Sequence, residues 1–236
     1  QPVLKLIMDR LPATLLLTGT AFALSLLFGI TLGALSARRA GTWVDSAITV
    51  VALLFYATPL YWLALMAVLV FTVQLEWLPG FGLMTVGSGH TGFALALDVA
   101  KHLVLPALTL ALFYMAVYAR MTRAAMLEVA QMDFVKTARA KGVKPGRILR
   151  AHVLRNALLP VVTLAGIQAG GMIGGAVLTE TVFAWPGIGR LMFDALLQRD
   201  YSLLLGAFLV TAAMAVLFNL ITDLVYTLVD PRIELT

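Results

Sequence analysis

The chain has 236 residues, of which 61% are hydrophobic and 12% are charged, and its net charge is +5. This composition exceeds what the core of a soluble domain needs and predicts a membrane protein. The absence of cysteine excludes disulfides, thiolate metal sites and cysteine nucleophiles.

Five stretches contain no charged residue, and each is long enough to cross a membrane. They are residues 11–37, 46–75, 103–119, 156–179 and 201–222. A bilayer core of about 30 Å takes about 20 helical residues, and the shortest stretch can extend into its polar flanks. We therefore predict an all-α, polytopic transmembrane helical bundle with five spans in this chain. Pro59, Pro106 and Pro160 lie inside these stretches and are expected to kink or start helices.

Two of these stretches carry glycines at four-residue spacing. Gly29 and Gly33 lie in the first, and Gly166, Gly170 and Gly174 lie in the fourth. Such faces let helices approach closely. The pattern fits helix packing within one subunit, a dimer contact or the lining of a pore.

Basic residues divide the connections between the spans into two sides. Residues 120–155 contain nine Lys and Arg against two acidic residues, and Arg38, Arg39 and Arg232 fall on the same side. The positive-inside rule places this side in the cytoplasm. The predicted cytoplasmic segments are 38–45, 120–155 and 230–236, and the predicted outer segments are 76–102 and 180–200. Residue 1 is then outside, so we expect a further N-terminal span that is absent from this sequence.

The cytoplasmic loop 120–155 has a helical pattern of its own. Five residues recur at helical spacing on one face: Leu127, Ala130, Phe134, Ala138 and Gly142. The pattern ends at the Val-Lys-Pro-Gly sequence of residues 143–146. A short helix with a small-residue face could dock into a groove on a soluble partner. Alternatively, the basic loop could lie on anionic lipid.

The same loop carries the first part of a family resemblance. Thr-Ala-Arg-Ala-Lys-Gly at 137–142, followed by His152, Arg155-Asn156 and Leu159-Pro160, resembles the "EAA" loop of inner-membrane permeases of binding-protein-dependent ABC importers. The variant is that of the dipeptide, oligopeptide and nickel permease group. Other segments agree in order and spacing, so the resemblance runs from residue 11 to residue 232: Leu-Pro-Ala-Thr at 11–14, Trp-Leu-Pro at 77–79, the segment 180–189, Arg-Asp-Tyr at 199–201 and Asp-Pro-Arg at 230–232.

The resemblance implies an ABC importer type I permease fold in the bacterial inner membrane, with several passes. Residues 1–236 would form a single transmembrane permease domain, and residues 120–155 would be the coupling loop within it. The implied partners are a homologous second permease subunit, two cytoplasmic ATPase subunits, an extracytoplasmic solute-binding protein and membrane lipid, with no nucleic acid. The implied mechanism is alternating access, in which closure of the ATPases is passed through the loop helix to the bundle.

Candidate site residues follow from matching positions in this family. The ATPase-coupling set is Lys136, Thr137, Ala138, Arg139, Ala140, Lys141 and Gly142. Ala138 and Gly142 match the small residues that let the coupling helix sit closely on the ATPase, whereas the Glu of the family motif falls at Lys136. The outer-gate or binding-protein contact set is Glu180, Phe183, Trp185, Pro186 and Gly187, with an interfacial aromatic belt as the alternative for Trp185.

Polar residues also mark the inner end of the last span. The set is Asn219, Asp223, Asp230 and Arg232. A carboxylate inside a membrane is costly unless it is paired or hydrated, so we expect Asp223 to pair with a loop arginine. A proton relay at Asp223 is the alternative.

These residues predict a permease subunit that moves short peptides by alternating access, and not an enzyme. The sequence has no GxxxxGK[ST] phosphate-binding loop, so we expect ATP and Mg to be used by the partner ATPases and no cofactor or metal to be bound by this chain. One alternative is the import of a nickel chelate or another small solute by the same architecture. Two others are an ion-coupled secondary transporter using Asp223 and Glu180, and a membrane anchor that recruits a soluble protein.

Overall fold

The computed structural model describes residues 2–229, with the side chains of 173–175 and 222–229 left out. Within this range the regular elements are all helical, which confirms the all-α prediction. They are α1 (Val3–Arg38), α2 (Trp43–Ala57), α3 (Leu60–Ala67), the π-helical segment Val68–Gln74, α4 (Gly92–Val129), α5 (Asp133–Ala140), α6 (Pro145–Arg147), the π-helical segment Ile148–Leu154, α7 (Arg155–Val182), α8 (Ile188–Gln198) and α9 (Tyr201–Val229).

Four helical segments of the described chain are long and apolar enough to cross a membrane: Val3–Arg38, Gly92–Val129, Pro145–Met172 and Tyr201–Ile221. The charge-free stretch 46–75 meets the same criteria only as a bent pair of helices, which brings the number to five if the pair is one span. There α2 and the helix that follows it are bent by 101° at Pro59. Proline lacks a backbone N–H and disfavours helix at the residue before it, and Thr58 is accordingly extended. Pro106 and Pro160, by contrast, lie inside α4 and α7.

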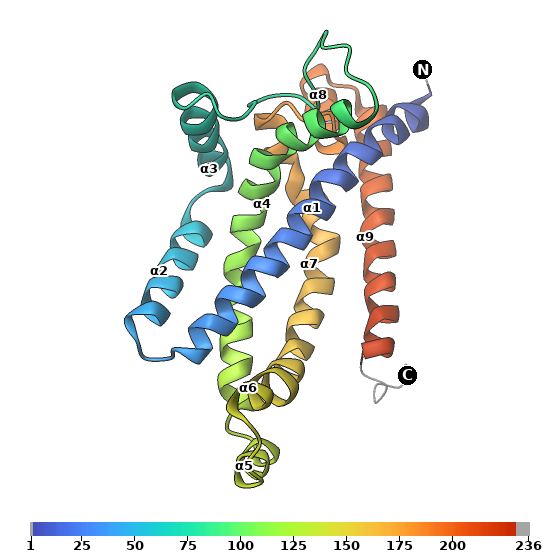
Figure 1. Cartoon of the computed structure of the whole chain (residues 1–236). Coiled ribbons are helices and arrows are strands. Elements are labelled where there is room, and N and C mark those ends of the chain that lie inside the picture. Colours follow the sequence, from blue (N-terminus) through green and yellow to red (C-terminus); the bar gives the residue numbers. More distant parts are fainter. Residues whose placement is uncertain (1, 230–236) are drawn as a thin grey trace.

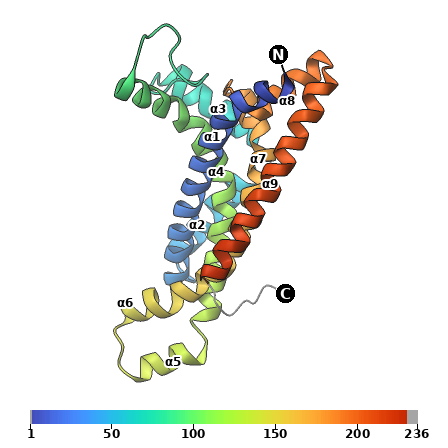
Figure 2. The same cartoon turned by 90° about the vertical axis from the view of Figure 1, so that its right-hand side faces the viewer.

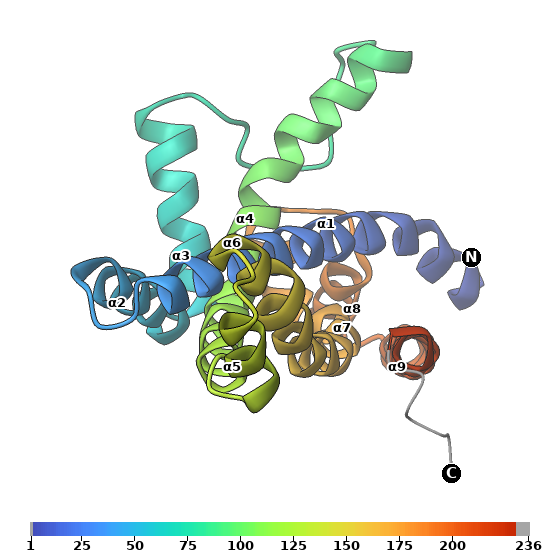
Figure 3. The same cartoon turned by 60° about the horizontal axis from the view of Figure 1, so that its bottom comes forward.

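The connections gather at two ends of the bundle, as the basic residues predict. In Figures 1 and 2 the start of α1, the segment 75–91 and α8 lie at one end, whereas the α1–α2 turn, α5 and α6 lie at the other. Figure 3 shows α3 and the first turns of α4 projecting sideways from the bundle. We refer to the end with α5 as the cytoplasmic end and to the other as the outer end.

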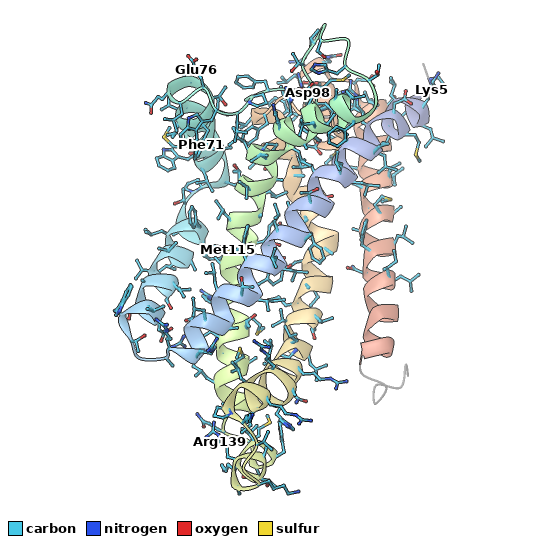
Figure 4. The ribbon with its side chains drawn as sticks, viewed as in Figure 1. Lys5, Phe71, Glu76, Asp98, Met115 and Arg139 are labelled. Carbon is cyan, nitrogen blue, oxygen red and sulfur yellow. The ribbon has the colours of Figure 1, made fainter. Side chains whose placement is uncertain are left out.

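The centre of the bundle is the crossing of α1, α4 and α7. Its buried cluster combines small and aromatic residues, among them Ala21, Tyr118 and Ala165, and Met115 lies at mid-height of α4 (Figure 4). A Cβ built on Gly29 would lie 2.5 Å from the Cβ of Tyr118, and one on Gly33 would lie 2.5 Å from the carbonyl oxygen of Ala119. Only glycine therefore allows α1 to lie this close to α4.

The glycines of α7 are divided between two neighbours. A Cβ built on Gly170 would lie 3.0 Å from Oδ1 of Asn219 and 3.2 Å from a carbonyl oxygen of α9, so Gly170 lies at the α7–α9 contact. Gly166 is buried and lines a cavity of about 390 Å³ between α1, α7 and α9. The side-chain environment of Gly174 lies outside the described residues.

Candidate functional site

The cytoplasmic loop contains a short helix, α5, that is separate from α4. The prediction of one continuous helical face over 127–142 is wrong, because α4 ends at Val129 and the backbone is extended at Met132 before α5 begins at Asp133. The break contains neither glycine nor proline, so no local signal marked it. Figure 1 shows α5 at the cytoplasmic tip of the molecule, and Figure 4 labels Arg139 there.

The inner face of α5 packs against its own chain. Val135 is 0% exposed and Ala138 is 7% exposed. They belong to a buried cluster with residues of α4, of the π-helical segment Ile148–Leu154 and of the start of α7: Ala125, Met126, Val129, Ile148, Val153 and Ala157. Ala138 thus packs mainly within this chain, and its contact with an ATPase stays a prediction.

The outer face of α5 is open. Phe134, which the periodic pattern placed on the same face as Ala138, is 41% exposed. Lys136, Thr137, Arg139, Ala140 and Lys141 are also exposed. Lys136 forms an ion pair with Asp133 at 2.8 Å, and both side chains face solvent, so this pair stabilises little. The exposed residues leave a face of α5 available to a partner.

Gly142 ends α5 by its backbone conformation. Its φ is +73°, and its amide donates to the carbonyl oxygen of Arg139 at 3.0 Å. A left-handed residue after the last turn is a common helix ending, and glycine adopts it without strain. A Cβ at Gly142 would meet open space, so the structure assigns this glycine to the turn and not to a close contact within the chain.

A buried carboxylate joins the α1–α2 turn to α4 near the cytoplasmic end. Asp45 accepts hydrogen bonds from Arg123 Nε at 2.7 Å and Nη2 at 2.8 Å, and from the amide of Gly41 at 3.0 Å. It also accepts one from the hydroxyl of Ser36. The two-pronged arginine contact fixes geometry as well as charge. Sequence reasoning counted Arg123 only as a cytoplasmic charge and missed Asp45, although an acid next to the long charge-free stretch 46–75 was a usable signal.

At the outer end, Glu180 is the centre of a clasp between α7, α8 and α1. Glu180 is 0% exposed. It accepts hydrogen bonds from the hydroxyl of Thr14 at 2.8 Å and from the amide of Arg190 at 3.0 Å. The same Thr14 hydroxyl accepts from the amide of Ile188 at 2.8 Å. One carboxyl group therefore joins the end of α7, the start of α8 and the first third of α1.

The aromatic residues of this segment complete the clasp. Trp185 is fully buried and donates through Nε1 to the carbonyl oxygen of Ala13 at 2.8 Å. Phe183 is buried, Gly187 is buried, and Pro186 is partly exposed. Apart from Pro186, the residues predicted to form an outer contact surface therefore have little surface to offer. The reason is that the segment folds back onto α1, where residues 11–14 supply its partners.

A different part of the outer end is exposed. The segment 75–91 is fixed by Asp98 of α4, which accepts from the amide of Thr85 at 2.7 Å and from its hydroxyl at 2.9 Å. Apolar side chains project from this region: Trp77, Phe81, Val86 and Phe93. Figure 4 shows Asp98 beneath the loop. Asp98 was not identified from the sequence, because an isolated acid beside an apolar span has no distinguishing pattern.

The inner-end polar residues are described only in part. Asn219 is exposed on α9 and lies against α7 at Gly170. The side chain of Asp223, and Asp230 and Arg232 altogether, lie outside the described residues. The ion pair expected at Asp223 stays a prediction.

Comparisons with known proteins cover nearly the whole chain. A model of the family described as "Binding-protein-dependent transport system inner membrane component" matches residues 29–235. A dipeptide transport system permease protein of Alkalihalophilus pseudofirmus is 40% identical over 250 residues, which cover 99% of this chain and 74% of the relative. An oligopeptide transport system permease protein of Bacillus subtilis is 43% identical over 233 residues, which cover 99% of this chain and 72% of the relative.

The fold is also similar to solved structures. Inward-facing conformations of the MetNI methionine ABC transporter match with a TM-score of 0.74 and 19% identity, over 98% of this chain and 99% of that chain. An amino acid ABC transporter determined with histidines matches with a TM-score of 0.63 and 17% identity, over 97% and 94% of the two chains. At these identities the likeness concerns the fold.

Proposed function

Because this chain belongs to the family of binding-protein-dependent transport system inner membrane components, we propose that it forms half of a membrane path that carries short peptides into the cytoplasm. The chain is a multi-pass permease subunit of an ABC importer of the inner membrane, and ATP is hydrolysed by separate subunits. Relatives 40–43% identical over at least 94% of this chain are named for dipeptides, di- and tripeptides and oligopeptides, which supports peptide as the cargo.

A permease of this family works with ATPase and solute-binding partners. Our proposal for the assembly is this chain, one homologous second permease, two ATPases that use ATP and Mg²⁺, and one extracytoplasmic binding protein. The whole chain acts as one permease domain in this assembly. The mass of the purified complex tests the proposed numbers of subunits, since a complex with one ATPase, or without a second permease, would contradict them.

The two-sided character of α5 is the observation that carries the proposed mechanism. Its exposed face, including Phe134 and Lys141, is available to an ATPase, while Val135 and Ala138 are anchored in the bundle. A displacement of α5 therefore acts directly on α4 and on the start of α7, since the three share one buried cluster. From α4 it reaches α1 and α2 through the glycine crossing and the Asp45–Arg123 contact. Packed helices transmit such shifts because their contacts have little room to deform.

The exposed outer loop replaces the clasp as the proposed contact for the binding protein. Trp77, Val86 and Phe93 offer apolar surface around a loop that Asp98 holds in place. Apolar and aromatic surface of this kind is typical of the centre of protein–protein contacts. The clasp then has a structural role, which is to hold α7 and α8 against α1.

The function is tested by peptide uptake into proteoliposomes. Vesicles holding this chain, its partner permease and the ATPases, with the binding protein and a labelled tripeptide on the outer side, should accumulate peptide only when ATP is present on the ATPase side. Matched vesicles lacking the ATPases are the control. Uptake that persists in that control, or uptake driven by an ion gradient without ATP, would contradict the proposal.

A further inference from the structure

A polar pocket lies between α2 and α4 near the cytoplasmic end. It has a volume of about 560 Å³ and is lined by Asp45, Ser46, Thr49, Val50, Arg120 and Arg123. We call it the α2–α4 pocket. Val50 is the single apolar side chain among these six. The other five carry charged or polar groups that a small polar ligand can use.

The charges lining the pocket do not cancel. Asp45 is engaged by Arg123 through two hydrogen bonds, so that pair is neutral together. Arg120 takes part in none of the ion pairs formed by the described residues. The remaining net charge is thus one guanidinium, which can donate two parallel hydrogen bonds to a carboxylate or phosphate.

The guanidinium of Arg120 lies against an aromatic side chain of α2. Its guanidinium carbon lies 5.7 Å from the centre of the Tyr56 ring, and that ring stacks on Phe113 at 5.5 Å with an interplanar angle of 19°. Tyr56 follows Asp45 by eleven residues on α2, which is about 16 Å along a helix axis. An arginine near a membrane surface ordinarily extends toward the headgroups, whereas this one lies against Tyr56, further along α2 than Asp45.

Arg120 lies on α4, a helix long and apolar enough to cross a membrane, and a charge on such a helix needs water or a polar ligand. Ionisable side chains inside a membrane face the interior of a bundle or a hydrated cavity, and they mark the paths of polar solutes. Arg120, Ser46 and Thr49 are all exposed on this chain, so they face outward from α2 and α4. The hydroxyl of Thr49 is committed to the backbone oxygen of Asp45 at 2.9 Å, which leaves Ser46 as the neighbouring hydroxyl that can turn to a ligand.

We propose that the α2–α4 pocket is a binding station on the translocation path, in which Arg120 binds the terminal carboxylate of the peptide cargo and Ser46 donates a further hydrogen bond to it. This inference rests on the proposed function and names the chemical group of the substrate that this chain recognises. A free peptide has one such carboxylate whatever its side chains, so a site of this kind accepts many sequences. An anionic lipid headgroup shares the same chemistry, and the test separates the two sources.

Thiol protection tests the station, because the chain contains no cysteine. A Thr49→Cys variant places one thiol of this chain in the pocket. The complete importer is reconstituted in nanodiscs of zwitterionic lipid, and the rate of alkylation by a small water-soluble reagent is followed on this chain. We expect a tripeptide to slow the reaction several-fold and the same tripeptide with an amidated C-terminus to leave it unchanged. Adding Arg120→Gln should abolish the protection, Arg120→Lys should keep part of it, and Arg150→Gln, outside the pocket, should keep all of it.

The inference is overturned if the thiol at position 49 does not react at all, with or without ATP. It is also overturned if the free and amidated peptides slow alkylation equally, or if the free peptide still slows it in the Arg120→Gln variant. Slower alkylation with anionic lipid and no peptide would assign the pocket to a lipid headgroup and would overturn it too. ATP-driven peptide uptake, measured in the same preparations, distinguishes a failure of the binding station from a failure of the proposed import function. If uptake is intact but protection is absent, the binding station alone fails; if the unaltered complex takes up no peptide, the proposed function fails.

Discussion

Replacing Gly187 by alanine tests the outer clasp. The backbone at Gly187 is extended, with φ −97° and ψ −178°, so alanine brings no backbone strain there. A Cβ at this position would overlap all three carboxyl atoms of Glu180. The carboxyl group must then leave the hydroxyl of Thr14 and the amide of Arg190. A buried donor left without a partner costs about 1–3 kcal/mol, so we expect Gly187→Ala to lower the free energy of unfolding by about 2–6 kcal/mol.

Glu180→Ala removes the carboxyl group that a Cβ at position 187 would overlap, together with the hydrogen bonds that this carboxyl group accepts. It should cost about the same as Gly187→Ala, and adding Gly187→Ala to it should cost less than about 1 kcal/mol, because the new Cβ then enters vacated space. Unfolding in mixed micelles can be followed by the change in tryptophan fluorescence when Trp185, the one fully buried tryptophan among the described residues, becomes exposed. Gly19→Ala is the matched control, since a Cβ there meets nothing within 4 Å. Additive costs in the double variant, or an unchanged stability in Gly187→Ala, would refute this account of the clasp.

Three further predictions concern the cytoplasmic half of the bundle. Gly33→Leu should reduce the yield of folded permease in detergent, because a Cβ at position 33 would lie 2.5 Å from the carbonyl oxygen of Ala119 and would separate α1 from α4. An unchanged yield would contradict the close crossing of the two helices. Ala138→Leu should lower uptake per ATP by overpacking the buried face of α5, whereas Ala140→Leu on the exposed face should not affect this packing. Asp45→Asn should lower the free energy of unfolding, measured with a chemical denaturant, by about 1–2 kcal/mol, and the cost is modest because the Arg123 side chain is 34% exposed. Adding Arg123→Gln to Asp45→Asn should lower the free energy of unfolding little further.

The architecture could be predicted from the sequence because it depends on local composition. A charge-free run long enough to cross a bilayer can be read directly from the sequence, and the excess of basic residues over 120–155 distinguishes the two ends of the bundle. Proline at position 59 marked a break, but its angle of 101° depends on how the following helix packs against α4 and α7. The charge-free stretches and the break at Pro59 were therefore predictable, and the angle of the bend was not.

The site contacts depend on residues far apart in the chain. Thr14 and Glu180 are 166 positions apart, and Asp45 and Arg123 are 78 apart. Nothing in the spacing of either motif reveals that they meet. For α5, periodicity identified an apolar face but could not tell whether another protein or the same chain covers it. The match of Ala138 to a small residue of the family motif did not reveal it either, whereas the structure shows that Val135 and Ala138 face the bundle.

The central claim is that α5 carries the movement of the ATPases into the bundle through its buried face. Val135→Ser tests it most directly, because Val135 is 0% exposed and the substitution leaves the outer face of α5 unaltered. The measurement is the number of peptides imported per ATP hydrolysed in proteoliposomes of the complete importer. We predict that ATPase binding and ATP hydrolysis persist while this ratio falls several-fold. A ratio equal to that of the unaltered complex would contradict the account.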